Sequence, residues 1–373
     1  MADMNVTPAR GGLTPQIWDG MAFLEYVRKN RFARYMGTTL NSMIQVKKDL
    51  TVKKGDSITF ATVRRLQGAG VTGNTILEGN EEILDQRSLK LTVAPVRHAV
   101  AVTDWDDQKS SIDLRNVARQ ALINWEMEKM RADIMIALSA VSSNPVVSYA
   151  TANATQRNAW LVANSDRVRV GNSAANYSAG VLATGLSALT VGTDRMTGAL
   201  LSLAKRMAQT ANPHIRPIQL DDANDEEWFV VFMPSRVYRD FRNDPVVASF
   251  NKDARPREGS EWANNPLFSG GDLLWDGMFV REIPELPILT GVAASGGDVA
   301  ASFICGAQAM GIGWAQTLKT TTNVRDYGYV HGVGIQEMRG LCKLQFGRDP
   351  AVDTATPVDN GIMTIFTSAP PDV

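Results

Sequence analysis

The chain has 373 residues, of which 44% are hydrophobic and 21% charged, and its formal net charge at pH 7 is −1. This balance is typical of a globular protein and argues against a molecule whose whole surface binds polyanions. Its two cysteines, Cys305 and Cys342, have no paired spacing, and no uninterrupted apolar run reaches about 18 residues, so the sequence predicts no disulfide framework, zinc cluster or membrane span.

The N-terminal segment is the most basic part of the chain. Residues 1–54 contain nine basic and four acidic residues, and nine minus four gives this segment a charge of +5. Such a segment forms either a solvated surface or a face that meets phosphates or an acidic partner. Thr14 and Pro15 are a helix-start signal, and the apolar residues that follow at helical spacing predict a helix that ends near Lys29.

Two alternating stretches predict a pair of strands. They are GDSITFATVRRL, which begins at Gly55, and LKLTVAPVRHAVAVTDW, in which Pro95 predicts a break. About 20 residues separate them, far more than a hairpin loop needs, and they include one short helical possibility, Glu81 to Gln86. We therefore expect a long projecting arm, which a partner surface completes because an isolated hairpin is marginal in water.

The glycines Gly68, Gly70 and Gly73 of GAGVTG match the G-x-G-x-x-G pattern of dinucleotide-binding proteins. That pattern requires a buried strand before it and a long helix that begins at its glycines. Here the preceding strand is half polar and carries Arg64 and Arg65, and a further strand follows. The glycines therefore fit the tip of the arm better, and a nucleotide-binding enzyme remains the alternative.

A long helix and an α/β block follow. Two apolar rows predict a helix over residues 113–140, with Asp113 as its N-cap. Thr193 is a candidate cap for a helix over residues 194–210, and Ser235 for a second helix after the strand WFVVFMP. A strand pair is expected around Asp276-Gly277. The last strands are expected between residues 324 and 347.

Candidate chemistry is sparse. The acidic run Asp221–Glu227 lacks the spacing of a calcium loop, and Ser235 does not lie in a G-x-S-x-G motif. His331 and Cys342 are eleven residues apart in a predicted strand, which separates them by about 36 Å if the strand is straight. We therefore expect no catalytic, cofactor-binding or metal-binding residues, and no enzymatic activity.

The order of these parts resembles the major capsid proteins of tailed bacteriophages, which have the Hong Kong 97-like fold. The resemblance is diffuse and spans the chain from Leu13 to Gly347. It rests on LTPQIWDGMAFLEYVRKNRFARYMG, the two strand stretches above, FVVFMPSRVYRDFRNDP and FSGGDLLWDGMFVREIPELP. It implies an α+β fold whose parts are an N-terminal arm (1–50), an extended loop (51–88), a peripheral domain (89–192 and 319–347) with a spine helix (113–140), an axial domain (193–318) and a C-terminal tail (348–373).

The resemblance also implies a function. The chain would self-assemble as hexamers and pentamers into the icosahedral head of a double-stranded DNA phage, inside the host bacterial cytoplasm, and would end up in the virion. Scaffolding, portal and decoration proteins would be its partners, with non-specific contact to packaged DNA and no membrane contact. An encapsulin-like compartment shell is a further alternative, because it shares this fold.

The residues expected at contacts between subunits fall into two groups, on the arm and at its base. The arm group is Arg64, Arg65, Gly68, Gly70, Gly73 and Glu78, and the base group is Lys47, Lys48, Lys53 and Lys54.

Overall fold

The protein is a mixed α+β chain whose structure, a computed structural model, describes residues 30–51, 55–63, 66, 68–74, 76–84, 86–110, 112–178, 180–219, 227–253, 273–347 and 357–372. The predicted helix over residues 15–29 lies outside this part of the chain, as does the acidic run before Glu227. The chain divides into two compact units. The smaller includes Pro95–Met130 and Leu318–Glu337, and the larger includes Arg31–Ala94, Arg131–Thr317 and Met338–Val373.

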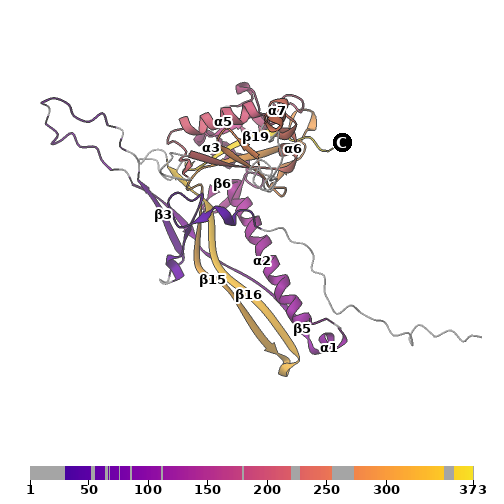
Figure 1. Ribbon diagram of the computed structural model, residues 1–373. Helices are drawn as coiled ribbons and strands as arrows, with labels where there is room; N and C mark the ends of the chain where they lie inside the picture. Colours follow the sequence, from indigo (N-terminus) through magenta and orange to yellow (C-terminus); the bar gives the residue numbers. More distant parts are fainter. Residues whose placement is uncertain are drawn as a thin grey trace, which may run out of the picture. The chain divides into compact units, whose positions relative to one another are not determined.

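The larger unit is built on an eight-stranded mixed sheet (Figure 1). Its strands are β8 (Val168–Val170), β9 (Ile218–Gln219), β10 (Glu227–Met233), β11 (Leu273–Trp275), β12 (Met278–Glu282), β13 (Ile288–Leu289), β14 (Val299–Cys305) and β19 (Ile362–Ser368). Six of them lie in the order β11, β12, β10, β14, β19, β8, while β13 pairs with β14 and β9 with β10. The predicted strand pair around Asp276-Gly277 is confirmed as β11 and β12, and both turn residues have positive φ, at 46° and 69°.

Both faces of this sheet are covered, which explains why β14 and β19 are buried along their whole length. The helices of the unit are α3 (Ala154–Ala163), α4 (Leu182–Ser187), α5 (Gly198–Thr210), α6 (Ser235–Asn243) and α7 (Pro245–Asp253). Val231 of β10 packs in one core cluster with Leu201 of α5 and Phe241 of α6. Its neighbour in sequence, Phe232, points to the other face and contacts the Phe32 ring, with centroids 5.0 Å apart.

Our assignment of residues 348–373 to a C-terminal tail is wrong for the part of the segment that the structure describes. Ile362–Ser368 forms β19, which pairs antiparallel with β14 from Val299↔Ser368 to Cys305↔Ile362 and is buried along its whole length. The four prolines of residues 348–373 all lie outside this strand. The sheet also includes β8, so it extends beyond the predicted boundaries of 193–318 on both sides.

Two predicted helix caps are also wrong. The helix expected from Asp194 begins at Gly198, where the Thr197 hydroxyl accepts a hydrogen bond from the Leu200 N–H at 3.2 Å. Ser235 is the first residue of α6 rather than its cap, and Pro234 holds the cap position without a side-chain bond. Proline is suited to a helix start because it lacks the N–H that would be left without a partner there.

The predicted two-stranded arm is present at its base. β3 (Ser57–Val63) and β4 (Gln86–Thr92) pair antiparallel in the register Ser57↔Thr92 to Val63↔Gln86. The described residues between them form no helix or strand, so the helix considered at Glu81–Gln86 is wrong, and Gln86 already belongs to β4. The pair packs against β15 (Met310–Arg325), where a Cβ on Gly311 would come within 2.7 Å of the Phe60 ring.

The larger unit also contains short strand pairs and 3₁₀ turns outside the eight-stranded sheet. β1 (Met36–Gly37) and β2 (Ile44–Lys47) pair in parallel, and β2 also pairs in parallel with β15. β6 (Ala140–Ser143) pairs with β7 (Val146–Ser148), and β17 (Gln345–Gly347) with β18 (Pro357–Asp359). Short 3₁₀ turns lie at Ala33–Tyr35, Asp49–Thr51, Ala174–Asn176 and Ala294–Gly296.

In its described residues the smaller unit combines one long helix with three strands. Its elements are β5 (Ala94–Thr103), α1 (Asp104–Lys109), part of α2 (Leu114–Leu138), and the outer parts of β15 and β16 (Val330–Lys343), which a turn at Asp326–Gly328 connects. The predicted helix over 113–140 is confirmed within two residues at each end, and Asp113 caps it by accepting a hydrogen bond from the Asn116 N–H. The predicted break near Pro95 is confirmed at Val93, between β4 and β5.

Candidate assembly surfaces

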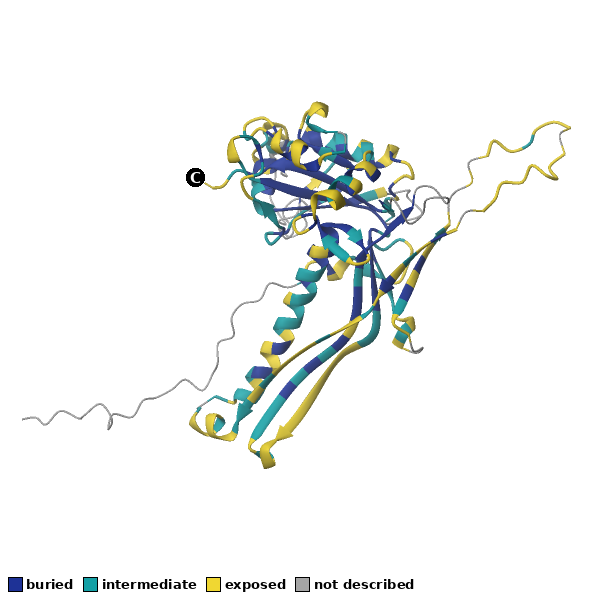
Figure 2. Cartoon of the chain, turned by 180° about the vertical axis from the view of Figure 1, so that it is seen from behind, coloured by how far each residue is buried: buried dark blue, intermediate teal, exposed yellow. Residues whose placement is uncertain are grey.

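The β3–β4 loop, residues 64–85, carries most of the residues that the sequence assigned to subunit contacts. Gly68, Gly70, Gly73 and Glu78 lie in it and are exposed, as the yellow loop of Figure 2 shows. Gly70 and Gly73 have φ of 68° and 72°, and a Cβ on either would meet nothing within 4 Å. These glycines therefore permit a left-handed backbone rather than the close approach of another group. Arg64 and Arg65 lie outside the described residues.

No helix begins at these glycines, which removes the geometric basis of a dinucleotide site. The loop is instead stabilised by local contacts. The Gly68 N–H donates to Glu82 Oε2 at 2.6 Å across the loop, and the Gly79 N–H donates to Glu81 Oε2 at 2.8 Å. A turn closes where the Asn80 N–H donates to the Leu77 carbonyl at 3.0 Å.

Large aliphatic side chains project from this loop into solvent. Ile83 is 89% exposed and Ile76 is 71% exposed. Three more exposed aliphatic residues of the loop are Leu66, Leu77 and Leu84. Scattered single apolar residues are normal on a protein surface, but five in one loop of about 20 residues mark an interaction surface.

The structure describes two of the four lysines predicted at the base of the arm, Lys47 and Lys48. Lys47 is already engaged in its own chain, because its Nζ donates to the Thr59 carbonyl at 2.8 Å and lies 4.7 Å from the centroid of the Phe60 ring. Lys47 thereby links β2 to β3 within its own chain. Lys48 is exposed at the end of β2, and Lys53 and Lys54 lie outside the described residues.

The sheet of the smaller unit has one covered face. Val100, Val333 and Ile335 pack with Leu122 and Trp125 of α2 in a single cluster. The His98 ring lies on Trp125, with centroids 4.6 Å apart. Residues that alternate with these point to the opposite face, which no described helix of this unit covers.

His331 and the two cysteines, which the sequence analysis considered, make contacts within the chain. His331 Nε2 lies 3.1 Å from Asp104 Oδ1, which also binds Arg115 at 2.8 Å, so these contacts join β16, α1 and α2 within the smaller unit. Burial raises the pKa of the Cys342 thiol to about 12 and also raises that of Cys305, which keeps both cysteines protonated and unreactive.

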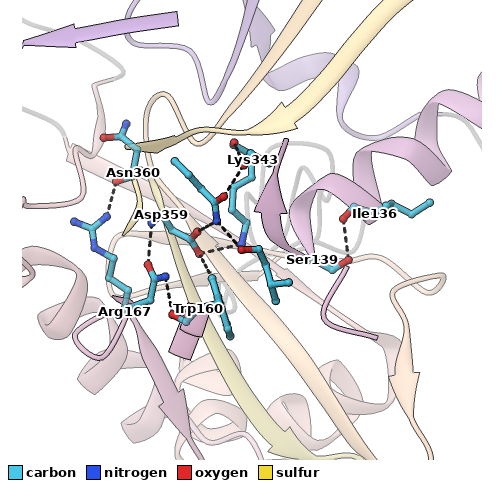
Figure 3. Close-up of polar contacts among 11 residues, drawn as sticks. Ile136, Ser139, Trp160, Arg167, Lys343, Asp359 and Asn360 are labelled. Atoms are coloured by element: carbon cyan, nitrogen blue, oxygen red, sulfur yellow. Dashed lines mark hydrogen bonds and ion pairs between the residues drawn. The ribbon is translucent and has the colours of Figure 1, made fainter. Parts of the chain in front are cut away.

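A buried polar cluster surrounds the ion pair of Lys343 and Asp359 (Figure 3). Lys343 Nζ and Asp359 Oδ2 are 2.9 Å apart, and both side chains are 1% exposed. The same carboxylate accepts hydrogen bonds from Gln345 Nε2 at 2.7 Å and Trp160 Nε1 at 3.2 Å. The Asp359 N–H donates to Asn164 Oδ1 at 2.8 Å. The cluster is closed and mutually satisfied, as expected for a structural link between β17, β18 and α3.

An apolar hollow of about 750 Å³ lies beside α5, α7 and β11. Its lining includes Phe241, Val247, Phe250 and Trp275. Polar groups at its wall are already bonded, since Asp244 accepts from the Gly198 N–H at 2.7 Å and Trp275 Nε1 donates to Ser202 Oγ at 3.1 Å. The lining brings together no nucleophile and base. In the part of the chain that the structure describes, no three His, Cys, Asp or Glu side chains gather as metal ligands, and no helix is long and apolar enough to cross a bilayer.

Comparisons with known proteins agree with one another. A family model described as "Phage capsid protein" matches residues 11–371. The chain is 27% identical over 382 residues to the major capsid protein of Pseudomonas phage KPP25, covering 95% of this chain and 94% of that protein. The solved capsid asymmetric unit of cyanophage Pam1 superposes with a TM-score of 0.87 at 33% identity, covering 99% of this chain and all of that one. The capsid protein of Ralstonia phage GP4 shares the fold, with a TM-score of 0.74 at 20% identity and coverage of 99% and 100%.

Proposed function

Because the chain belongs to the phage capsid protein family and is a major capsid protein that forms the coat of a phage head, we propose that it self-assembles into the icosahedral shell of a tailed, double-stranded DNA phage. Its hexamers and pentamers would close the shell through many copies of modest interfaces. Scaffolding, portal and decoration proteins would be its partners, assembly would take place in the host cytoplasm, and contact with packaged DNA would be non-specific.

We assign the elements to the parts of a Hong Kong 97-like subunit. Residues 1–50 are the N-terminal arm, 51–88 the extended loop, and α2 the spine helix of a peripheral domain that also contains β5, β16 and the outer part of β15. The eight-stranded sheet and α5–α7 form the axial domain, which β8 and β19 extend beyond 193–318. The α+β composition and the similarity to the Pam1 capsid support this assignment.

The observation that carries the self-assembly proposal is the exposure of Ile76, Leu77, Ile83 and Leu84 in the β3–β4 loop. Each such side chain gains about 1.5–3 kcal/mol when it moves from water into an apolar contact. The chain itself leaves them in solvent, so a second subunit is the natural source of that contact. The family has a structural role, and we propose that this chain likewise has no enzymatic activity and needs no cofactor.

Deletion of residues 67–80 tests the role of the loop. We expect a folded subunit, with unchanged circular dichroism, that forms few or no shells in sedimentation and electron microscopy, with or without scaffolding protein. Normal shells from the deleted chain would contradict the role of the loop, and a wild-type chain that stays monomeric in every condition would contradict shell formation itself.

A further inference from the structure

The apolar hollow beside α5, α7 and β11 has the size of a ligand site. Its volume of about 750 Å³ lies within the range of about 300–1,000 Å³ that small-molecule sites occupy. Its lining residues all belong to the larger unit, so one subunit forms the hollow without a second copy. Phe250 and Val246 on its wall are 62% and 51% exposed. Within the described residues, the hollow is therefore open to a molecule from solution.

Three aromatic rings stand along one side of the hollow. The Trp275 ring of β11 meets the Phe250 ring of α7 edge to face, with centroids 5.4 Å apart and an angle of 88° between the planes. Trp275 meets Phe241 of α6 in the same way, at 6.1 Å and 90°. Edge-to-face and offset-stacked contacts are the arrangements that aromatic rings prefer. A flat aromatic ligand would extend this set of contacts and cover apolar surface that the chain leaves in water.

The polar groups of the wall are already used within the chain. Besides the Gly198 N–H, Asp244 accepts a hydrogen bond from the Val246 N–H at 3.2 Å, and Trp275 Nε1 is engaged by Ser202. The affinity for a ligand would therefore come from apolar contact. A strongly polar ligand would lose its hydrogen bonds to water here without replacing them, which disfavours its binding.

The charges of the wall also exclude one class of ligand. The described lining contains two carboxylates, Asp244 and Asp276, and no Lys, Arg or His side chain. Asp276 pairs with Lys205 at 3.2 Å, outside the lining. An anionic ligand would meet like charges at this wall, which disfavours fatty acids and other carboxylates.

We propose that the hollow is a binding site for a small, uncharged molecule that carries a flat aromatic ring. The size of the hollow, its three rings and its acidic wall select that class. The inference is independent of the proposed shell function, because a single unassembled subunit contains the whole described lining.

The chain's own residues 254–272 are the competing occupant. They connect α7 to β11 and contain Trp262, Leu267 and Phe268. The same 19 residues also contain five charged residues and three glycines, so holding them in the hollow would cost much conformational entropy for little apolar contact. A rigid aromatic molecule avoids most of that cost, which favours the free ligand.

The uncharged dye N-phenyl-1-naphthylamine tests the site, because its fluorescence rises in apolar surroundings. We expect saturable binding to the unassembled, full-length subunit. The site is defined by a substitution that fills it. Ala199 is exposed on α5 and lines the hollow, so Ala199→Trp places a ring there without disturbing the buried core. This variant should bind the dye at least about tenfold more weakly, because it occupies the aromatic wall.

Ala159→Trp is the matched control. Ala159 is exposed on α3 and does not line the hollow, so its replacement should leave the Kd of the dye unchanged within about twofold. Circular dichroism confirms that both variants are folded. Equal binding of the dye by the two variants would place it elsewhere on the chain and would overturn the proposal.

The chemical class of the ligand is tested with a second dye. 1-Anilinonaphthalene-8-sulfonate has the same rings and adds a sulfonate. At the site that Ala199→Trp blocks, it should bind at least about tenfold more weakly than the uncharged dye, because of the carboxylates of the wall. Equal affinity of the two dyes at that site would overturn the assignment to uncharged ligands.

A further variant distinguishes the competing occupant. If the wild type does not bind the dye, but a chain with Trp262→Ser, Leu267→Ser and Phe268→Ser does, residues 254–272 fill the hollow and the proposal is overturned. Failure of both chains to bind would overturn it as well. Particle formation is measured separately by electron microscopy, so the loss of this site and the loss of the shell function are independent results.

Discussion

The strands β14 and β19 and the β3–β4 loop use similar aliphatic residues in opposite surroundings. Every residue of the two strands is buried, whereas in the loop Ile83 is 89% exposed. The strands are covered by helices and aromatic residues of the same chain, but the described part of the chain provides no cover for the loop. The sheet therefore stabilises a single subunit, and the loop contributes its free energy only when subunits meet.

This contrast separates two kinds of substitution. A change in the sheet should lower the free energy of unfolding of one subunit and affect assembly only as a consequence. A change in the loop should leave the subunit stable and alter the concentration at which shells form. The four predictions below test this separation, beginning with the largest expected effect.

Phe303→Ala should destabilise the unassembled subunit by about 3–5 kcal/mol, because it leaves a cavity in β14 between Phe232 of β10 and Thr364 of β19. Urea unfolding followed by circular dichroism measures this loss. Val162→Ala is the control, because Val162 is exposed on α3 and its loss should change stability by less than about 0.5 kcal/mol. A loss below about 1 kcal/mol for Phe303→Ala would show that the sheet is not the stabilising core.

Asp359→Ala should be nearly as damaging, at about 3–5 kcal/mol, because it leaves the Lys343 ammonium buried without its partner. Lys205→Ala removes one member of a more exposed pair with Asp276 and should cost no more than about 1 kcal/mol. Both values come from the same denaturation measurement. Equal losses in the two variants would mean that water reaches the Lys343–Asp359 pair.

Much of the fold could be predicted from the sequence because the signals are local. The caps and apolar rows of α2 lie within the helix itself, and the Asp276-Gly277 turn lies between its two strands. The assignment of residues 348–373 as a tail failed because the partner of β19 is β14, about 60 residues earlier in the chain, and no local pattern shows that pairing.

The candidate surfaces show the same limit. The long loop between the paired strands β3 and β4 could be predicted from the length and glycine content of residues 64–85, because both are properties of one segment. The uncovered face of the smaller unit's sheet could not be found in this way, since Arg97 and Lys319 are more than 200 residues apart in the sequence and share that face only through the register of β5, β16 and β15. The hydrogen bond from Lys47 to the Thr59 carbonyl likewise joins two strands of the chain that no local pattern pairs, while the predicted subunit contact of Lys47 stays a prediction.

Gly311→Ala probes the boundary between the two regions. The new Cβ would lie 2.7 Å from the Phe60 ring, so β3 and β4 would have to shift away from β15. We expect a loss of about 1–3 kcal/mol, as for other overpacked sites, together with lower assembly because the loop is re-aimed. Gly192→Ala, where nothing lies within 4 Å of the new atom, should change neither quantity by more than the error of the measurement. Unchanged stability in Gly311→Ala would show that Phe60 can move without cost.

Ile83→Ser is the smallest change for the subunit and the most specific for the shell. Because the side chain is exposed, its replacement should alter the free energy of unfolding of an unassembled subunit by less than about 0.5 kcal/mol. If a second copy covers Ile83, the loss of about 1.5–3 kcal/mol per contact should raise the subunit concentration needed for half-assembly by about 10- to 100-fold. Light scattering against concentration measures that midpoint, and Val162→Ala again provides the control. A variant that unfolds more easily yet assembles at the wild-type concentration would place Ile83 against its own chain, and the distinction between a self-sufficient sheet and a partner-dependent loop would then be lost.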